Sequence, residues 1–256
     1  MLYDLANAWL NSAGLVKILK ALRTPTSLKT VSSSFPNMFL KVKAVLFDLD
    51  GTLVDTFEAF HIMVNDILRR FNMPERSFSE NARLVGKTSR TIAETIAKET
   101  GLNMNLEEFS TMMVREWIYT YMPKYGRLYP DALETLRELR KRGYLLGVVS
   151  NTSREELPNY LNSFKIGGFF NVTVSAGDAE KPKPAPEPVL KAVKMLNVKP
   201  EEALMIGDRP EDIESGRAAG TYTAAVLRSV RPKSELEAAK PDFIINELSE
   251  ILSIIL

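Results

Sequence analysis

The segment VKAVLFDLDGT, residues 42–52, is a short apolar run that ends abruptly in two carboxylates, a glycine and a threonine. The run from Val42 to Phe47 has the length and the β-branched and aromatic content of a buried strand. Asp48 and Asp50 are therefore expected at the carboxyl end of that strand, with both side chains on one face of the extended backbone. Open α/β sheets bind their ligands at this edge.

Two carboxylates so close together carry an energetic cost. At roughly 4 Å, like charges repel by about 4 kcal/mol at an effective dielectric constant of 20. Either one carboxyl keeps its proton or a cation lies beside the pair. Both arrangements suit a carboxylate nucleophile next to a carboxyl group that gives and takes a proton. The alternative is a solvated turn, since Asp and Gly are common turn residues.

Two further segments place anion-binding groups after apolar residues or in a stiff loop. The run YLLGVV, residues 144–149, ends in Ser150 and Asn151, where a hydroxyl and backbone amides can bind an anion. The loop EKPKPAPEP, residues 180–188, holds Lys183 in a backbone that prolines stiffen. Plainer interpretations exist, because Ser and Thr are good helix caps and a surface linker can be rich in Pro and Lys.

A third apolar run, ALMIG at residues 203–207, leads into Asp208. Pro210 marks the first turn of a predicted helix, which puts Asp212 about one helical turn from Asp208. Two carboxylates so placed suit a hard cation, since Mg²⁺ prefers oxygen ligands. The attraction of acids to a helix N-terminus also explains Asp212, but it explains Asp208 less easily.

The four motifs, in this order, resemble those of the haloacid dehalogenase superfamily, whose members transfer phosphoryl groups through an aspartate nucleophile. They are Asp-x-Asp-Gly-Thr at 48–52, Ser-Asn at 150–151, Lys-Pro at 183–184, and Gly-Asp at 207–208 with a second Asp at 212. The resemblance extends from about residue 41 to the C-terminus. It is closest to the capped branch that includes phosphoglycolate phosphatases and β-phosphoglucomutases.

The resemblance implies an α/β fold, a Rossmann-like doubly wound parallel sheet with an inserted helical cap domain. The alternation of apolar runs and helical segments predicts the same sheet, with Asp131 and Pro210 at helix starts. The expected domains are an N-terminal helical extension over 1–40, a core over 41–55 and 128–256, and a cap over 56–127. Strands are expected at 44–47, 144–149, 171–174, 203–206, 221–226 and 243–245.

The resemblance also implies catalytic roles for the first two motifs. Asp48 is expected to attack phosphorus and become an aspartyl phosphate. Asp50 is expected to protonate the leaving alkoxide and then to activate the attacking water. Ser150 and the Asn151 amide are expected to hold the transferred phosphoryl group.

Lys183 is expected to neutralise charge between nucleophile and phosphate. It is preferred to Lys181 because residues 183–186 reproduce the superfamily's Lys-Pro-x-Pro at its usual approach to the Gly-Asp motif. The expected ligands of Mg²⁺ are the carboxylates of Asp48, Asp208 and Asp212 and the backbone carbonyl of Asp50. With Asp50 protonated, about three negative charges then face about three positive charges from Mg²⁺ and the lysine.

Between residues 55 and 127 the apolar pattern changes to helical spacing, which predicts the cap. Within it, Lys87 stands near a helix start in LVGKTSR, residues 84–90, and is the candidate for substrate specificity. Ordinary helix capping by Thr88 explains this stretch equally well. His61, the single histidine, is expected to be structural.

The composition fits a compact protein with one substantial core: 256 residues, 45% hydrophobic and 25% charged. A net charge of +1 favours neither nucleic acid nor a membrane surface as a partner. The lack of cysteine excludes disulfides and thiol catalysis and fits a cytoplasmic location. No apolar stretch reaches the roughly eighteen residues of a transmembrane segment.

The first forty residues lie outside the resemblance. Their apolar spacing predicts one or two amphipathic helices, which are expected to pack on the core or on a neighbouring subunit and so to allow self-association. A membrane-surface helix and an artefactual start upstream of Met38 are the alternatives. Asp4 and the lack of a basic n-region argue against a signal peptide.

The function expected from these features is that of a Mg²⁺-dependent phosphatase acting on a small organic phosphate, phosphoglycolate-like or a sugar phosphate. A sugar phosphomutase is the enzymatic alternative, because it shares the first half-reaction. An alternative of another class is a phosphoryl-responsive switch or binding protein, since receiver domains also gather carboxylates and a lysine. The Asp-Gly-Thr motif and the large cap favour the enzyme.

Overall fold

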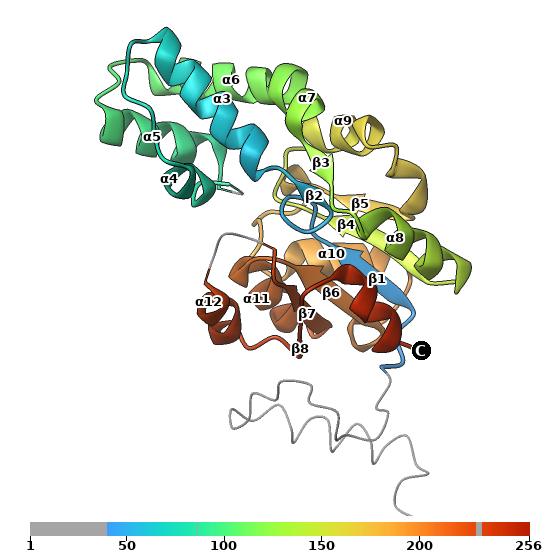
Figure 1. Ribbon diagram of the computed structural model, residues 1–256. Helices are drawn as coiled ribbons and strands as arrows, with labels where there is room; N and C mark the ends of the chain where they lie inside the picture. Colours follow the sequence, from blue (N-terminus) through green and yellow to red (C-terminus); the bar gives the residue numbers. More distant parts are fainter. Residues whose placement is uncertain (1–39, 86, 229–231) are drawn as a thin grey trace, which may run out of the picture. The chain divides into compact units, whose positions relative to one another are not determined.

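The computed structural model describes residues 40–85, 87–228 and 232–256 (Figure 1). Its main sheet has six parallel strands in the order β5-β4-β1-β6-β7-β8. They are β1 (Ala44–Phe47), β4 (Leu145–Val149), β5 (Val172–Val174), β6 (Ala203–Gly207), β7 (Tyr222–Val226) and β8 (Phe243–Ile245). All six predicted strands are present, so the parallel sheet is confirmed. The predicted N-terminal helices and their self-association lie outside the described residues.

Helices cover both faces of this sheet. They are α8 (Ala132–Lys141), α9 (Glu156–Ser163), α10 (Glu187–Met195), α11 (Pro210–Ala219) and α12 (Lys233–Ala238). Short 3₁₀ turns are η3 (Gly167–Phe169), η4 (Ala176–Asp178), η5 (Pro200–Glu202) and η6 (Leu248–Ser253). Within the described ranges, no helix has the length and apolar character to cross a bilayer.

Strand β1 shows why both faces need cover. Alternate residues of a strand point to opposite faces. Val45 and Phe47 therefore pack in one core with residues of α8 and α9, whereas Ala44 and Leu46 pack in another with residues of α10. None of these four residues has exposed surface. A strand buried on both faces reads as a continuous apolar run, which is how the sequence revealed it.

A helical insert follows the loop after β1. It contains α3 (Phe57–Arg70), α4 (Phe78–Ala82), α5 (Ser89–Thr100), α6 (Leu106–Glu116), the π-helical turn η2 (Trp117–Tyr121) and α7 (Met122–Tyr125). Its hydrophobic cluster draws all of its buried members from residues 57–121. Two short antiparallel strands, β2 (Val54–Asp55) and β3 (Arg127–Leu128), pair where the chain enters and leaves the insert. The helices lie within the interval predicted for the cap, but the two short strands were not predicted.

His61 makes structural contacts inside this insert. Its Nδ1 lies 3.1 Å from Asn81 Nδ2, and its ring packs edge-on against Phe78. The side-chain oxygen of Asn81 accepts a hydrogen bond from Arg76 Nε at 2.8 Å. These contacts tie α3 to α4.

Asp131 precedes α8, but its side chain does not cap that helix. The carboxylate forms an ion pair with Arg228 and accepts a hydrogen bond from the Leu248 N–H at 2.6 Å. Arg228 also donates to the Thr52 carbonyl at 3.1 Å and lies 4.1 Å from the centre of the Tyr129 ring. The helix begins where expected. The Asp131 carboxylate binds the Arg228 guanidinium instead of the first-turn N–H groups, because hydrogen bonds between two charged groups are stronger.

We expect Asp131→Ala to lower the free energy of unfolding by about 1.5–3 kcal/mol, the usual contribution of hydrogen bonds to a charged group. The substitution leaves the Arg228 side chain, which is 6% exposed, without its carboxylate. Urea unfolding measures the change. Glu134→Ala is the matched control, because Glu134 is an exposed acid in the first turn of α8. Equal effects of the two substitutions would contradict a stabilising role for the Asp131 contacts.

Candidate active site

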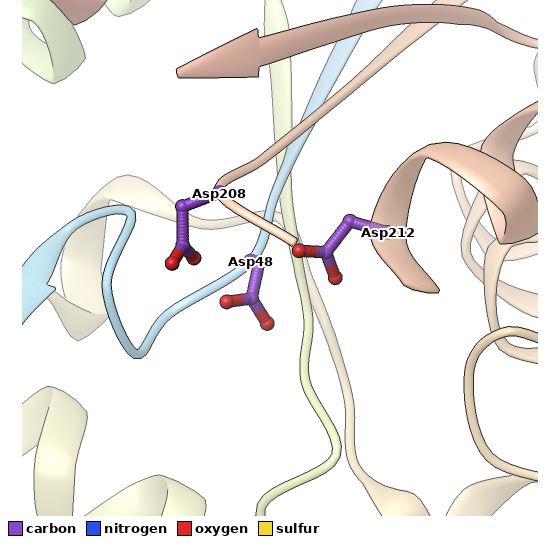
Figure 2. A group of neighbouring side chains, drawn as sticks. All are labelled: Asp48, Asp208 and Asp212. Carbon is purple, nitrogen blue, oxygen red and sulfur yellow. The ribbon is translucent and has the colours of Figure 1, made fainter. Parts of the chain in front are cut away.

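Three carboxylates from separate parts of the chain meet beyond the carboxyl ends of β1 and β6 (Figure 2). Asp48 follows β1, Asp208 follows the neighbouring strand β6, and Asp212 lies in the first turn of α11. One ligand oxygen from each lies within 4.8 Å of the others, and all three residues are buried. Because β1 and β6 run parallel, their carboxyl ends share one edge of the sheet.

Two glycines allow this close approach. A Cβ atom at Gly207 would lie 2.3 Å from the Asp212 side chain, and one at Gly51 would lie 2.4 Å from Asp208 Oδ2. Gly51 also has a φ of +86°, a left-handed conformation that other residues adopt at a cost. Each glycine therefore leaves the space that a carboxylate occupies.

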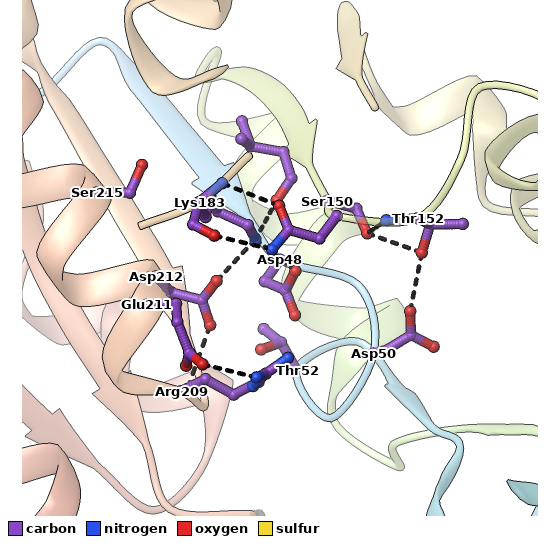
Figure 3. Close-up of polar contacts among 12 residues, drawn as sticks. Asp48, Asp50, Thr52, Ser150, Thr152, Lys183, Arg209, Glu211, Asp212 and Ser215 are labelled. Atoms are coloured by element: carbon purple, nitrogen blue, oxygen red, sulfur yellow. Dashed lines mark hydrogen bonds and ion pairs between the residues drawn. The ribbon is translucent and has the colours of Figure 1, made fainter. Parts of the chain in front are cut away.

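Lys183 places a positive charge among these carboxylates (Figure 3). Its Nζ donates to Asp48 Oδ1, Asp212 Oδ1 and the Val149 carbonyl oxygen, each at 2.6 Å. These contacts use all three ammonium protons. The Asn151 side chain holds the lysine backbone, donating to the Lys183 carbonyl at 3.1 Å and accepting from its N–H at 3.0 Å.

The two candidate lysines differ in position. Lys183 is buried, with 4% of its surface exposed, whereas Lys181 is exposed. The side-chain amide of Asn151 is occupied by Lys183, so a phosphate contact from this residue would fall to its backbone N–H. Lys183, and not Lys181, is therefore the lysine that contacts the buried carboxylates.

Burial and mutual repulsion disfavour the charged forms of the three carboxylates. Burial raises the pKa of Asp208 well above its ordinary value, and the charges of Asp48 and Asp212 raise it further. Burial raises the pKa of Asp212 to about 6; Asp48 adds to this rise, and Lys183 opposes it. Burial acts to lower the pKa of Lys183, but the charges of Asp212 and Asp48 outweigh it and raise that pKa. The charge of Arg209 also lowers the pKa of Asp208 and Asp212, but together with Lys183 it does not offset the effects that raise them.

The donor set fits a hard divalent cation. Asp208 Oδ2 is buried and, among the described residues, has no hydrogen-bond partner, while Thr52 Oγ1 donates to Asp208 Oδ1 at 3.1 Å. A bare buried carboxylate oxygen costs free energy unless a cation or a proton meets it. All three clustered ligands are carboxylates, a donor set that suits Mg²⁺ better than metals that favour nitrogen or sulfur.

Asp50 lies apart from this group and points toward Thr152 (Figure 3). Its Oδ2 accepts a hydrogen bond from Thr152 Oγ1 at 3.0 Å. Burial raises the pKa of Asp50 to about 6, against the opposing effect of that hydrogen bond. The chain turns directly after β1, since the N–H groups of Leu53 and Val54 both donate to the Leu49 carbonyl, at 2.9 and 3.0 Å. The extended geometry behind the expectation of two acids on one face therefore ends with the strand.

Ser150 is buried at the carboxyl end of β4, and its Oγ donates to Thr152 Oγ1 at 2.9 Å. Lys87, in contrast, is exposed just before α5, and its side chain forms no hydrogen bond or ion pair with the part of the chain that the structure describes. Thr88 caps α5, because its hydroxyl accepts from the Thr91 N–H at 3.2 Å. A role for Lys87 in substrate choice stays a prediction.

Sequence reasoning missed three residues that border the site: Thr52, Thr152 and Arg209. Arg209 is buried, and its Nη2 donates to Glu211 Oε1 at 2.8 Å, while its N–H donates to Asp212 Oδ2 at 3.2 Å. Burial acts to lower the pKa of Arg209, but the charge of Glu211, followed by that of Asp212, outweighs it. Each missed residue follows a motif Asp or Ser within two positions, and that placement was the available signal.

Several known proteins are similar to this chain in sequence or in fold. Residues 45–226 match the family described as haloacid dehalogenase-like hydrolase. Over 216 residues the chain is 36% identical to "Pyrophosphatase PpaX" of Bacillus cereus (strain G9842), covering 84% of this chain and 97% of that protein. A solved structure described as a "predicted phosphoglycolate phosphatase" from Haemophilus somnus 129pt has a TM-score of 0.77 and 25% identity, covering 84% and 98% of the two chains. The haloacid dehalogenase-like protein SP0104 from Streptococcus pneumoniae shares the fold, with a TM-score of 0.72, 21% identity, and coverage of 83% and 98%.

Proposed function

The chain belongs to the haloacid dehalogenase-like hydrolases, and on that premise we propose that it is a Mg²⁺-dependent phosphatase that hydrolyses a small phosphate monoester through an aspartyl phosphate on Asp48. One observation carries the proposal: the Lys183 ammonium group contacts Asp48 and Asp212 at 2.6 Å within a buried group of three carboxylates. Phosphoryl transfer depends on a positioned nucleophile and on fixed charges around the transferred group. This group of side chains supports both requirements.

In the first step, Asp48 attacks phosphorus. Lys183 holds Oδ1, and no hydrogen bond from the described residues occupies Oδ2, which we assign as the nucleophile. As the new P–O bond forms, the bond to the leaving oxygen breaks, and its electron pair stays on that oxygen. Asp50 gives the leaving oxygen a proton, so the leaving group departs as an alcohol.

In the second step, water attacks the phosphorus of the aspartyl phosphate. Asp50, now ionised, takes a proton from the water as its oxygen bonds to phosphorus. The bond between phosphorus and Asp48 breaks, and the electron pair returns to the Asp48 carboxylate. Ser150 Oγ and the Asn151 N–H are proposed to donate to the phosphoryl oxygens in both steps, while Lys183 offsets their charge.

The groups that would hold Mg²⁺ all supply oxygen atoms as ligands. They are the carboxylates of Asp48, Asp208 and Asp212 and the backbone carbonyl of Asp50. When bound, the ion would offset negative charge on the phosphoryl oxygens and on the carboxylates. The buried, unpartnered Asp208 Oδ2 supports this assignment.

A panel of small phosphate esters, assayed with Mg²⁺ and with EDTA, tests the proposed function. Phosphoglycolate and sugar monophosphates are the proposed substrates, and inorganic pyrophosphate belongs in the panel because the relative from Bacillus cereus is named a pyrophosphatase. We expect phosphate release from at least one ester, and only with the metal. No release from any compound, or equal release in EDTA, would reject the proposal.

The sugar phosphomutase alternative is separated by mass balance. A mutase passes the phosphoryl group from Asp48 to another sugar hydroxyl, so an isomeric sugar phosphate forms without free phosphate. We expect stoichiometric free phosphate and no isomer. Membership of a hydrolase family argues against a non-catalytic switch, and measurable turnover would exclude one.

Asp50→Asn is expected to slow both phosphorylation of Asp48 and hydrolysis of the aspartyl phosphate by roughly a hundredfold each, because an amide neither gives nor takes the required proton. Rapid acid quench separates the two rates. Stabilisation by Mg²⁺ in thermal unfolding is the control and should persist, since the Asp50 carboxyl lies outside the group of three carboxylates. Normal rates for both steps would remove Asp50 from the acid–base role.

A further inference from the structure

Three side chains form a continuous chain of hydrogen bonds at the carboxyl end of β4 (Figure 3). Ser150 Oγ donates to Thr152 Oγ1 at 2.9 Å, and Thr152 Oγ1 donates to Asp50 Oδ2 at 3.0 Å. The Thr152 N–H also donates to Ser150 Oγ at 3.1 Å, and its carbonyl accepts from the Ala176 N–H at 3.0 Å. The hydroxyl of Thr152 therefore joins a residue after β4 to a residue after β1.

We propose that Thr152 is a positioning residue, which holds the Asp50 carboxyl toward the leaving group of a phosphoryl group bound at Ser150. The inference rests on the acid–base role proposed above for Asp50. It adds a specific consequence: the hydroxyl of Thr152 determines how efficiently the leaving oxygen receives its proton. Thr152 itself does not contact the reacting atoms in this proposal.

The Asp50 carboxyl needs such a partner because rotation about the terminal torsion of its side chain is only weakly restrained. Its backbone is fixed by a bridge to Val54 and by the hydrogen bond from the Gly51 N–H to the Val54 carbonyl at 2.8 Å. The terminal torsion of an Asp side chain has broad minima, so the backbone alone does not orient the carboxyl oxygens. Asp50 Oδ1 and the Thr56 hydroxyl are both buried without a hydrogen-bond partner among the described residues. The Thr56 hydroxyl lies close enough to lower the pKa of Asp50, but less strongly than Thr152 does. The hydrogen bond from Thr152 to Oδ2 is therefore the direct contact that orients the carboxyl within the described part of the chain.

The hydroxyl of Thr152 suits both forms of a general acid and base. A hydroxyl has one proton to donate and lone pairs to accept with. In the structure, Thr152 donates a hydrogen bond to the Asp50 carboxylate and accepts one from Ser150. When Asp50 is protonated, Thr152 can still donate to Oδ2 if the proton lies on Oδ1, which has no hydrogen-bond partner among the described residues and can give the proton to the leaving oxygen. The same hydrogen bond therefore suits the acid and the carboxylate.

Two esters of similar size separate a role in proton donation from a general loss of structure. p-Nitrophenyl phosphate has a leaving group that departs without a proton, whereas benzyl phosphate releases an alkoxide that needs one. The value of kcat/KM reports the steps through the first phosphoryl transfer, in which Asp50 acts as the acid. We expect Thr152→Val to lower kcat/KM for benzyl phosphate by at least about tenfold, part of the usual contribution of a general acid. For p-nitrophenyl phosphate we expect a change below about threefold, since that reaction bypasses the acid.

Conservative and neighbouring variants make the test specific. Thr152→Ser keeps the hydroxyl and should restore most of the benzyl phosphate activity. Ser153→Ala is the matched control, because Ser153 Oγ accepts from the N–H of Glu156, the first residue of α9, at 3.2 Å and does not join the hydrogen-bond chain. We expect Ser153→Ala to lower the melting temperature while the ratio of the two kcat/KM values stays constant.

Three results would overturn the inference. Equal losses for both esters would give Thr152 a structural role only, as would a Thr152→Ser variant as impaired as Thr152→Val. A rise in KM for both esters at constant kcat would place its effect on phosphate binding through Ser150. Asp50→Asn, assayed in parallel, tells this failure from that of the proposed function. If Asp50→Asn shows the leaving-group dependence and Thr152→Val does not, only the role of Thr152 is rejected; if neither shows it, the acid role of Asp50 fails.

Discussion

Asp48→Asn should abolish phosphate release, with a fall in rate of at least about 10⁴-fold, because loss of a catalytic nucleophile leaves only binding and electrostatic effects. The assay is Mg²⁺-dependent hydrolysis of p-nitrophenyl phosphate. Acid quench of the wild-type protein with a labelled ester should trap a phosphorylated chain, and the variant should trap none. Activity of the variant within about tenfold of the wild type would reject the covalent mechanism.

The fold of the Asp48→Asn variant should survive the substitution. The side-chain oxygen of asparagine still accepts from Lys183, and the buried group loses one of three mutually repelling charges. We therefore expect a melting temperature in EDTA at least equal to that of the wild type, and a smaller rise on addition of Mg²⁺. Asp66→Asn is the matched control, since Asp66 pairs with Arg69 in the helical insert and should leave the activity within about twofold.

The parallel sheet could be predicted from the sequence because strands buried on both faces appear as continuous apolar runs. β1 and β6 appear as uninterrupted apolar runs that end in polar motif residues, and their predicted bounds differ from the observed ones by one residue at most. The strands β2 and β3 escaped prediction because two residues each are too few to show a period. The ion pair of Asp131 with Arg228 escaped for another reason: the two residues are 97 positions apart, and a local capping pattern was the signal at hand.

The motifs indicated which carboxylates meet at the site, whereas the spacing of side chains along an extended strand did not predict the direction of Asp50. Three of the four motifs follow strands that end at one edge of the sheet, so Asp48, Asp208 and Asp212 meet once the strand order is known. The direction of Asp50 depends on a turn that follows the strand at once, and strand geometry does not predict it. Contacts such as Thr152 with Asp50 join segments 102 positions apart, and only the folded chain identifies such partners.

Lys183→Met should damage both stability and activity. The methionine keeps the length of the side chain but removes the ammonium group that contacts Asp48 and Asp212 at 2.6 Å, and both carboxylates are buried. Removing one partner of a buried ion pair costs about 3–5 kcal/mol, because the remaining charge is left uncompensated. We expect a loss of that size in urea unfolding with EDTA. The phosphatase rate should also fall by roughly a thousandfold, since fixed positive charge stabilises the phosphoryl oxygens in the transition state.

Addition of Mg²⁺ distinguishes loss of the lysine's charge from a packing defect in this variant. A cation among the three carboxylates compensates the charge that the missing ammonium group supplied, so saturating Mg²⁺ should recover part of the lost stability, whereas a packing defect would not respond to the ion. Lys181→Met is the matched control, because Lys181 is exposed two residues earlier in the same loop and should change neither quantity appreciably. If Lys181→Met lost the activity and Lys183→Met kept it, the charge-neutralising role would pass to Lys181. If Lys183→Met were as stable in EDTA as the wild type, the buried acids would be protonated without the lysine's help, and its contacts would not stabilise the metal-free fold.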